Sequence, residues 1–209
     1  MKKFKIQAFS IFDESFKPIQ EIVEPNNKKY FTKYNIDYIS FDKDLEKFYC
    51  NSISNQHQKY WSKIFALKSL LEAKLNFDWF FLIDSDALII DHDIDLNIFP
   101  NLVPQDKELL ICEVNGHFTS KFWNVNTGVF FCKNSDYMKY IIEAIINIAI
   151  EQNFFNEQPI FQNILAKNYY GLADKTAIFP SYAFNHEGSF IYHACAFSTL
   201  DMDFSEAIK

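Results

Sequence analysis

The sequence contains no arginine: all 20 of its basic residues are lysines, against 27 acidic residues, and the net charge is −7. Proteins that track a nucleic-acid backbone rely on many cationic phosphate contacts, so an acidic chain without guanidinium groups is poorly suited to that partner. We therefore expect no nucleic-acid partner. If the substrate carries a diphosphate, lysine offers only point charges, and a bound metal ion becomes the natural way to neutralise it.

Cysteine is scarce, and its four positions form no C-x-x-C pair. Such wide spacing argues against a zinc site and against a disulfide framework, so we expect reduced cysteines in the core. The four are Cys50, Cys112, Cys132 and Cys195.

Targeting and membrane-spanning patterns are also missing. The lysine-rich N-terminus leads into an apolar stretch that Gln7 interrupts and that ends at Asp13 and Glu14, without a small-residue cleavage site. The most apolar helical stretch, residues 141–150, is much shorter than a bilayer span. We expect a soluble protein with no transmembrane segment, located in the cytoplasm or peripherally at a membrane.

The length of 209 residues and the 49% hydrophobic content predict a single domain, residues 1–209, with one sizeable core. Strand-like runs alternate with helical patterns, which is typical of an α/β sandwich with a mainly parallel central sheet and helices on both faces. The strands are expected at 5–12, 36–41, 78–83, 108–113, 128–133, 176–179 and 190–193. The helices are expected at 56–75, at 135–152, from near Pro159, and one on either side of Pro25.

Two carboxylates follow the most apolar strand. Asp84 and Asp86 are two residues apart, a spacing that points both side chains to one side of an extended segment. They lie where a buried strand ends, which is the edge at which open α/β sheets bind ligands. A polar turn is the usual explanation of an isolated D-x-D. Here apolar runs on both sides make a site for Mg²⁺ or Mn²⁺ with a phosphate-bearing ligand the better interpretation.

Other polar groups are ambiguous from the residues alone. His193 ends the last strand-like run and suits Mn²⁺ as a ligand, but an ordinary buried histidine is the commoner case. The run from Asn124 to Val129 suits sugar hydroxyls, and an Asx turn before a strand explains it equally well. Residues 156–158 fit either a reacting sugar or a helix N-terminus. Lys63, on the polar face of helix 56–75, is by itself more simply a solvated lysine.

Taken in order, these motifs resemble retaining glycosyltransferases of the GT-A type. The family of galactosyl-, mannosyl- and xylosyltransferases of fungi and plants has the pattern W-x-K, a helix, and then W-x-x-x-x-D-[AS]-D-A; the glycogenin-like family is the second choice. The resemblance spans about Tyr60 to His193. Its motifs are Trp61-Ser62-Lys63, Trp79 with Asp84-Ser85-Asp86-Ala87, Asn126-Thr127-Gly128-Val129, Glu157-Gln158, Phe179-Pro180, Asn185 and Tyr192-His193.

The resemblance implies a single Rossmann-like GT-A domain that transfers a sugar from a UDP- or GDP-sugar with retention of configuration. It implies an acceptor that is a glycan or a lipid-linked molecule, and a bound Mn²⁺ or Mg²⁺. The residues that it assigns are Asp84, Asp86 and His193 for the metal, Lys63, Asp84, Ser85, Asn126 and Gly128 for the donor, and Glu157 and Gln158 for catalysis. As Gln158 is a weak nucleophile, attack from the leaving-group face is favoured over a stable covalent intermediate.

Two other functions remain compatible with the residues. A phosphohydrolase with Asp84 as nucleophile also begins with an apolar strand ending in D-x-D, although Ala87-Leu88 replaces its usual Gly-Thr. A non-catalytic module that binds nucleotide sugars would need the same phosphate site. Both make predictions that differ from those of sugar transfer: release of phosphate for the first, and no turnover for the second.

Overall fold

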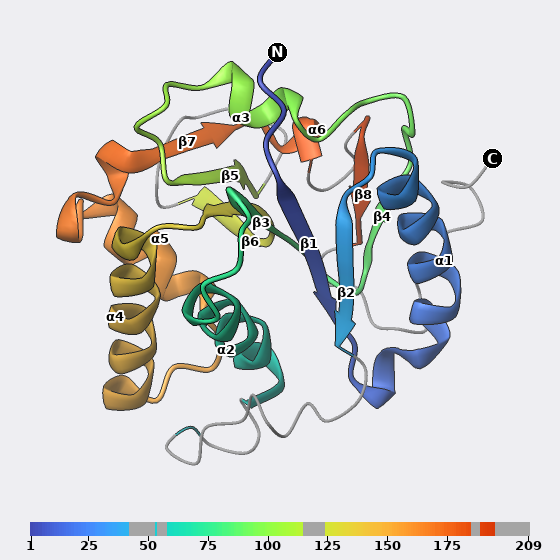
Figure 1. Cartoon of the computed structure of the whole chain (residues 1–209). Coiled ribbons are helices and arrows are strands. Elements are labelled where there is room, and N and C mark those ends of the chain that lie inside the picture. The colour runs from blue at the N-terminus through green and yellow to red at the C-terminus, as the bar shows by residue number, and fades with distance from the viewer. Residues whose placement is uncertain (42–52, 54–57, 115–123, 185–188, 195–209) are drawn as a thin grey trace.

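A central six-stranded sheet organises the chain (Figure 1). The computed structural model describes residues 1–41, 53, 58–114, 124–184 and 189–194. The strand order is β2-β1-β3-β6-β5-β7, and β4 and β8 form a separate two-stranded sheet. The strands are β1 (Ile6–Ile11), β2 (Asp37–Phe41), β3 (Trp79–Ile83), β4 (Ala87–Ile89), β5 (Leu109–Glu113), β6 (Val125–Lys133), β7 (Thr176–Phe179) and β8 (Ile191–His193).

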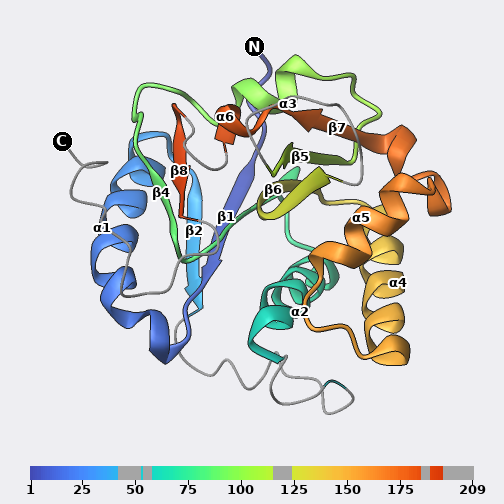
Figure 2. The same cartoon turned by 180° about the vertical axis from the view of Figure 1, so that it is seen from behind.

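Helices cover both faces of this sheet (Figures 1 and 2). The α-helices are α1 (Lys17–Lys33), α2 (Gln58–Glu72), α3 (Ile98–Leu102), α4 (Asp136–Gln152), α5 (Gln158–Ala166) and α6 (Ser181–Phe184). Short 3-10 helices occur at η1 (Glu14–Phe16), η4 (Tyr169–Gly171) and η5 (Ala173–Lys175). The predicted α/β sandwich is therefore confirmed.

The sheet is mostly parallel, as predicted, but β6 runs against both of its neighbours. The pairs β1-β2, β1-β3 and β5-β7 are parallel, whereas β3-β6 and β5-β6 are antiparallel. The strand β6 also begins three residues earlier than the expected start at Gly128, so Asn126 and Thr127 lie within the strand. The β5-β6 register is irregular near the start of β6: the partners of the consecutive residues Ile111 and Cys112 are Phe130 and Asn126, so the extra residues lie in β6.

Strand β3 is buried on both faces, as its apolar run predicts. Phe80 and Leu82 pack with the side chains of α2, α4 and α5, while Phe81 and Ile83 pack with those of α1 and α6 on the other face. The core therefore has two layers, one on each side of the sheet. The buried position of β3 fixes its carboxyl end, where Asp84 follows.

Helix α1 corrects one expectation. Pro25 lies inside a single helix from Lys17 to Lys33 and does not separate two helices. A proline in a helix removes one backbone hydrogen bond and strains the preceding turn. Here the buried side chains of Val23 and Tyr30, on either side of the proline, anchor both halves of the helix in the core, and this packing keeps the helix continuous.

The other helices follow the sequence pattern closely. Ser135 caps α4, accepting a hydrogen bond from the backbone N–H of Met138 at 3.1 Å, and Pro159 lies in the first turn of α5. Helix α2 is described from Gln58, so the expected start at Gln56 lies outside the described residues. Among the described helices, none is long and apolar enough to cross a membrane.

Cys112 and Cys132 are buried and form no disulfide, as predicted; Cys50 and Cys195 lie outside the described residues. Burial raises the pKa of both thiols well above the usual value, so they stay protonated at pH 8.

We expect iodoacetamide at pH 8 to leave both thiols unmodified in the folded protein and to modify both fully in guanidinium chloride. Peptide mapping by mass spectrometry separates the four cysteines, and rapid modification of Cys132 in native buffer would contradict the buried position.

Candidate active site

The turn after β3 places the two aspartates. The backbone N–H of Asp84 donates to the carbonyl of Gly128 in β6 at 2.8 Å, which continues the β3-β6 ladder by one residue. The carbonyl of Asp84 accepts from the N–H of Ala87 at 3.1 Å, so Ser85 and Asp86 form the tip of a tight turn into β4. The carboxylates therefore lie at the carboxyl end of a buried strand, as predicted.

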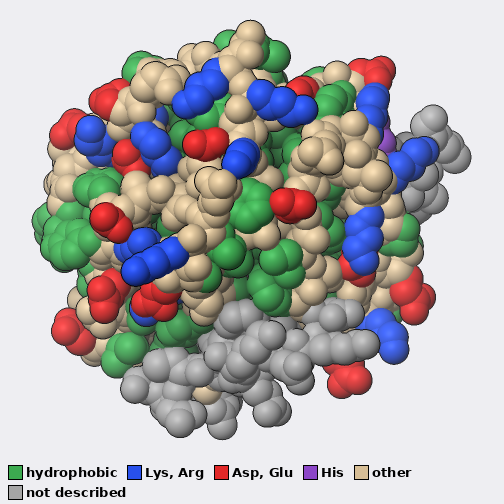
Figure 3. Space-filling view, in the orientation of Figure 1, with side chains coloured by type: hydrophobic (Ala, Val, Ile, Leu, Met, Phe, Trp, Pro, Cys, Tyr) green, Lys and Arg blue, Asp and Glu red, His purple; other side chains and the backbone are tan. Residues whose placement is uncertain are grey.

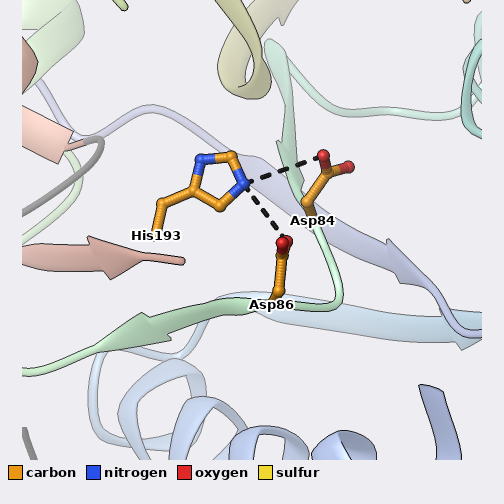
Figure 4. A group of neighbouring side chains, drawn as sticks. All are labelled: Asp84, Asp86 and His193. Carbon is orange, nitrogen blue, oxygen red and sulfur yellow. Dashed lines mark ion pairs between the residues drawn. The ribbon is translucent and has the colours of Figure 1, made fainter. Parts of the chain in front are cut away.

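His193 completes the group from the other end of the chain. Strand β8 pairs with β4 so that His193 lies opposite Ala87. Its Nε2 is 3.1 Å from Asp86 Oδ1 and 3.9 Å from Asp84 Oδ2 (Figure 4). The histidine side chain is only 4% exposed. The structure thus brings together the three residues that the resemblance assigned to a metal.

The three side chains fit a hard divalent cation. One ligand atom from each of Asp84, Asp86 and His193 lies within 4.8 Å of the other two. Ligands bonded at about 2.1 Å in octahedral geometry are about 3.0 Å apart when adjacent and about 4.2 Å apart when opposite. The observed separations need only small side-chain shifts to meet this geometry. Two carboxylates and an imidazole are also a donor set that suits Mn²⁺, and the carboxylates suit Mg²⁺.

Only glycine fits at position 128, because the side chains of the site lie close to the backbone there. A Cβ atom at this position would lie 2.0 Å from His193 Cε1 and 2.9 Å from Asp84 Oδ2. No side chain can therefore occupy position 128 while the histidine and the aspartate keep their places. The sequence suggested a donor-binding role for this glycine, which stays a prediction; the structure adds a steric role beside two of the metal-site residues.

Lys63 is not the solvated lysine that its place on α2 suggested. Its Nζ donates to both carboxylate oxygens of Asp84, at 3.1 and 3.0 Å, and lies 2.8 Å from Oε1 of Glu157. It also donates to the carbonyl oxygen of Thr127 at 3.3 Å. The lysine side chain is 14% exposed. The polar face of α2 thus faces the site at this position, and the lysine joins Asp84 to Glu157 at the start of α5.

Glu157 is tied into the same network from the start of α5. The carboxylate does not cap the helix but accepts from the Thr127 hydroxyl at 2.7 Å and pairs with Lys63, and its side chain is 4% exposed. Gln158 accepts through Oε1 from the backbone N–H of Thr127 at 3.3 Å. Thr127 is therefore a site residue that the sequence reasoning did not single out, although its place in Asn126-Thr127-Gly128 was the available signal.

Asn126 and Ser85 complete the residues assigned from the sequence. Asn126 is buried, and its Oδ1 accepts from the backbone N–H of Gly128 at 2.7 Å, which is the Asx geometry considered above, here inside β6. Ser85 is partly exposed in the turn between β3 and β4. All the assigned residues therefore lie on the turn after β3, on β6, on α2, at the start of α5, or at the end of β8.

The pKa values of the acids reflect a crowded, partly desolvated cluster. Burial raises the pKa of Asp84 to about 6; the attraction of Lys63 opposes this shift, and the charge of Asp86 adds to it. Burial also acts on Asp86, but attraction and a hydrogen bond from His193 outweigh it and hold the pKa below its usual value. Burial lowers the pKa of Lys63, yet Asp84 and Glu157 together raise it above its usual value. Lys63, which two carboxylates share, is therefore positively charged. Its single charge does not fully neutralise Asp84.

The charges of the cluster do not balance. Asp84, Asp86 and Glu157 carry three negative charges and Lys63 carries one positive charge; when His193 is in the neutral form in which a histidine ligates a metal, this leaves an excess of two negative charges. Uncompensated charge at a partly buried site is unfavourable. A divalent cation beside Asp84 and Asp86 would supply the missing charge.

Comparison with known proteins assigns the chain to a family. The model of the galactosyl transferase GMA12/MNN10 family matches residues 13–204. The chain belongs to this family. It is a glycosyltransferase, as the motifs from Tyr60 to His193 predicted. No curated protein matches the sequence.

Solved structures show that this family member has the GT-A fold. A glycosyltransferase involved in glycosylation of the major capsid of PBCV-1 superposes with a TM-score of 0.70 at 13% identity, over 92% of this chain and 94% of that one. The galactosyltransferase LgtC, solved with donor and acceptor sugar analogues, gives 0.54 at 14% identity over 91% and 87%. Mouse xyloside xylosyltransferase 1 gives 0.52 at 11% identity over 91% and 98%.

Proposed function

We propose that this glycosyltransferase transfers a sugar from a nucleoside-diphosphate donor to a hydroxyl of a glycan or lipid-linked acceptor, with a divalent cation and with retention of configuration. The observation that carries the proposal is the cluster of Asp84, Asp86 and His193 beside Lys63, with its excess of two negative charges. A donor diphosphate is itself anionic and cannot bind such a cluster unless a cation lies between them.

Asp84, Asp86 and His193 would hold the cation, which we propose to be Mn²⁺ or Mg²⁺. When bound, it acts as a Lewis acid that stabilises negative charge on the departing diphosphate. Ser85, Asn126 and Gly128 are proposed to contact the donor, because they lie on the turn and the strand that carry Asp84 and its hydrogen-bond partner. The UDP or GDP part of the donor would then occupy the carboxyl edge of the sheet.

In the proposed reaction, the bond between the anomeric carbon and the diphosphate oxygen breaks and the bond to the acceptor oxygen forms on the same face of the sugar. The acceptor proton passes to the departing diphosphate, so atoms and charge balance. Lys63 provides a fixed positive charge beside Asp84 that favours the development of charge on the leaving group. Other active sites that exclude water use preorganised cations in the same way.

The network around α5 supports same-face attack. Gln158 presents an amide, which is a weak nucleophile, and the Glu157 carboxylate is already engaged by Lys63 and Thr127. We infer that Glu157 acts through Lys63 by fixing its position, while Gln158 lies against the reacting sugar. The alternative is that Glu157 attacks the anomeric carbon; it requires the glutamate to leave both partners during the reaction.

The charges on one face of the molecule support the proposal that nucleic acid is not a partner. On the face shown in Figure 3, lysine and acidic side chains are interspersed, and its described residues form no continuous basic track of the kind that binds nucleic acid. The cytoplasmic location, with peripheral association at a membrane as its alternative, stays a prediction.

The proposal is tested by titrating UDP and GDP into the protein by calorimetry, with and without Mn²⁺. We expect one nucleotide to bind at least about tenfold more tightly with Mn²⁺, and Asp86→Ala to lose this enhancement, because the substitution removes the oxygen that lies 3.1 Å from His193. Asp93→Ala is the matched control: Asp93 is an exposed aspartate that pairs with Lys33 and lies outside the cluster.

A panel of nucleotide sugars, assayed for Mn²⁺-dependent hydrolysis, then identifies the donor without knowledge of the acceptor. Binding of neither nucleotide, or equal binding by wild type and Asp86→Ala, would overturn the proposal. Rapid release of phosphate from sugar phosphates, abolished by Asp84→Asn, would instead support the phosphohydrolase considered from the sequence. Nucleotide-sugar binding without any turnover would support the non-catalytic module.

A further inference from the structure

Asp86 and His193 adjoin or end two short strands that have few hydrogen bonds of their own. Strands β4 and β8 are three residues each and form a sheet with only one ladder between them. A two-stranded sheet is marginal when isolated, and an edge strand leaves half of its backbone groups unpaired. Asp86 directly precedes β4, and His193 is the last residue of β8. The geometry of the metal site therefore depends on what holds the outer edge of β4.

Two neighbouring asparagines of α1 hold that edge, and Asn27 makes two of the three hydrogen bonds. Asn27 Nδ2 donates to the carbonyl of Ala87 at 2.9 Å, and the N–H of Ile89 donates to Asn27 Oδ1 at 2.9 Å. The asparagine is 1% exposed. Its neighbour Asn26 donates through Nδ2 to the carbonyl of Ile89 at 2.7 Å. Helix α1 lies beside β4 in both views of the fold (Figures 1 and 2).

The side-chain amide of Asn27 acts in place of a neighbouring strand. A carboxamide has the same acceptor and donor groups as a peptide, and here both are used on two successive outward-facing residues of β4. The remaining group on this edge, the N–H of Ala87, donates to the carbonyl of Asp84 at 3.1 Å. Every backbone group on the α1 side of β4, from Ala87 to Ile89, is thus paired, as buried polar groups require.

The opposite edge of β4 holds the metal-site residues in register. Ala87 lies opposite His193, and the N–H of Ala194 donates to the carbonyl of Asp86 at 3.1 Å. A shift of β4 by one residue would turn its side chains to the other face and separate Asp86 from His193. The register that places Asp86 Oδ1 against His193 Nε2 is therefore fixed from two sides, by β8 and by Asn27.

We propose that Asn27 is a positioning residue for the metal site: its amide fixes β4 in the register that holds Asp86 against His193. The role is exerted through the backbone, and Asn27 itself lies on the opposite edge of β4 from β8. The metal-binding part of this inference rests on the proposed function, whereas the backbone part does not. Residues that orient metal ligands in this way contribute to affinity as well as to structure.

The backbone part is tested by amide hydrogen exchange of the metal-free protein. Asn27→Ala removes both hydrogen bonds, and Asn27→Leu removes them while filling the space. We expect both variants to exchange at least about tenfold faster than wild type at the N–H of Ile89, which loses its direct partner. We also expect faster exchange at the N–H of Ala194, because its partner, the carbonyl of Asp86, is no longer fixed.

The metal part is tested by titrating Mn²⁺ alone and following the electron paramagnetic resonance signal of the free ion. We expect at least about tenfold weaker binding in both variants. Asn26→Ala, at a less buried position, should also speed up exchange and weaken Mn²⁺ binding, but by smaller factors. The matched control is Asn134→Ala: its Nδ2 donates to the carbonyls of Leu75 and Phe77, so it too bridges backbone groups, but far from β4. It should leave the Mn²⁺ affinity and Ala194 exchange within about twofold of wild type.

Each outcome decides the inference. Faster exchange at Ile89 alone, with unchanged Ala194 exchange and Mn²⁺ affinity, would make Asn27 a local structural residue and overturn it. Equal loss of Mn²⁺ affinity in Asn134→Ala would trace the effect to general destabilisation, and would overturn it as well. If the wild type takes up no Mn²⁺, the proposed metal site fails. Exchange at Ala194 then still decides whether Asn27 fixes the register.

Discussion

Gly128→Ala is expected to weaken Mn²⁺ binding by about 100-fold and to remove metal-dependent transfer, although it adds a single methyl group. The added Cβ would lie 2.0 Å from His193 Cε1 and 2.9 Å from Asp84 Oδ2. The strand β6 is buried here, and both backbone groups of Gly128 are bonded, its carbonyl to the N–H of Asp84 at 2.8 Å and its N–H to Asn126 Oδ1 at 2.7 Å, so the backbone is held in place. His193 and Asp84 must therefore move, and both belong to the metal site. The measurement is Mn²⁺ affinity, followed by donor hydrolysis.

Gly171→Ala provides the control for this prediction. Gly171 has a left-handed backbone with φ of 72°, and no atom lies within 4 Å of the added Cβ. Alanine there should cost about 1 kcal/mol of stability from backbone strain and leave Mn²⁺ binding unchanged. At Gly128 no left-handed φ is involved, so the steric contact alone acts. Normal Mn²⁺ affinity in a folded Gly128→Ala protein would show that His193 is not confined as the structure indicates.

The sequence could predict the parts of the site that depend on local patterns. The continuous apolar run before Asp84 identifies a buried strand, and the two-residue spacing of Asp84 and Asp86 places both carboxylates at its end. The spacing of apolar residues likewise identified α2 and α4. The family resemblance then added His193 and Glu157, which no local pattern connects to the aspartates.

What the sequence could not predict depends on contacts between distant segments. His193 reaches Asp86 only because β8 pairs with β4 across more than a hundred residues, and neither short strand has a signal strong enough to specify that pairing. Lys63 lies on the polar face of α2, and periodicity cannot tell whether such a face meets water or a site. Pro25 remains within α1 because of tertiary packing, which outweighs its local preference.

Lys63→Met is expected to lower the free energy of unfolding by about 3 kcal/mol and to lower the rate of sugar transfer by at least about 100-fold. The substitution leaves the buried Glu157 carboxylate without its ion pair and Asp84 without the only cation bonded to it among the described residues. Affinity for Mn²⁺ should not fall, because removing a positive charge 3.0 Å from Asp84 Oδ2 also removes a competitor of the metal ion. Chemical denaturation, Mn²⁺ titration and a transfer or donor-hydrolysis assay measure the three effects.

The double variant Lys63→Met/Glu157→Gln separates folding from function. Neutralising both partners removes the unpaired buried charge, so most of the lost stability should return, as it does when buried ion pairs are replaced by neutral groups. Activity should not return, because the positive charge beside Asp84 is still missing. Lys68→Met, on the same helix, breaks an exposed pair with Glu72 and should change stability by less than about 0.5 kcal/mol. If the double variant is no more stable than Lys63→Met, the lysine stabilises the fold by packing and not by its charge. If the Lys63→Met protein is fully active, the lysine takes no part in the reaction.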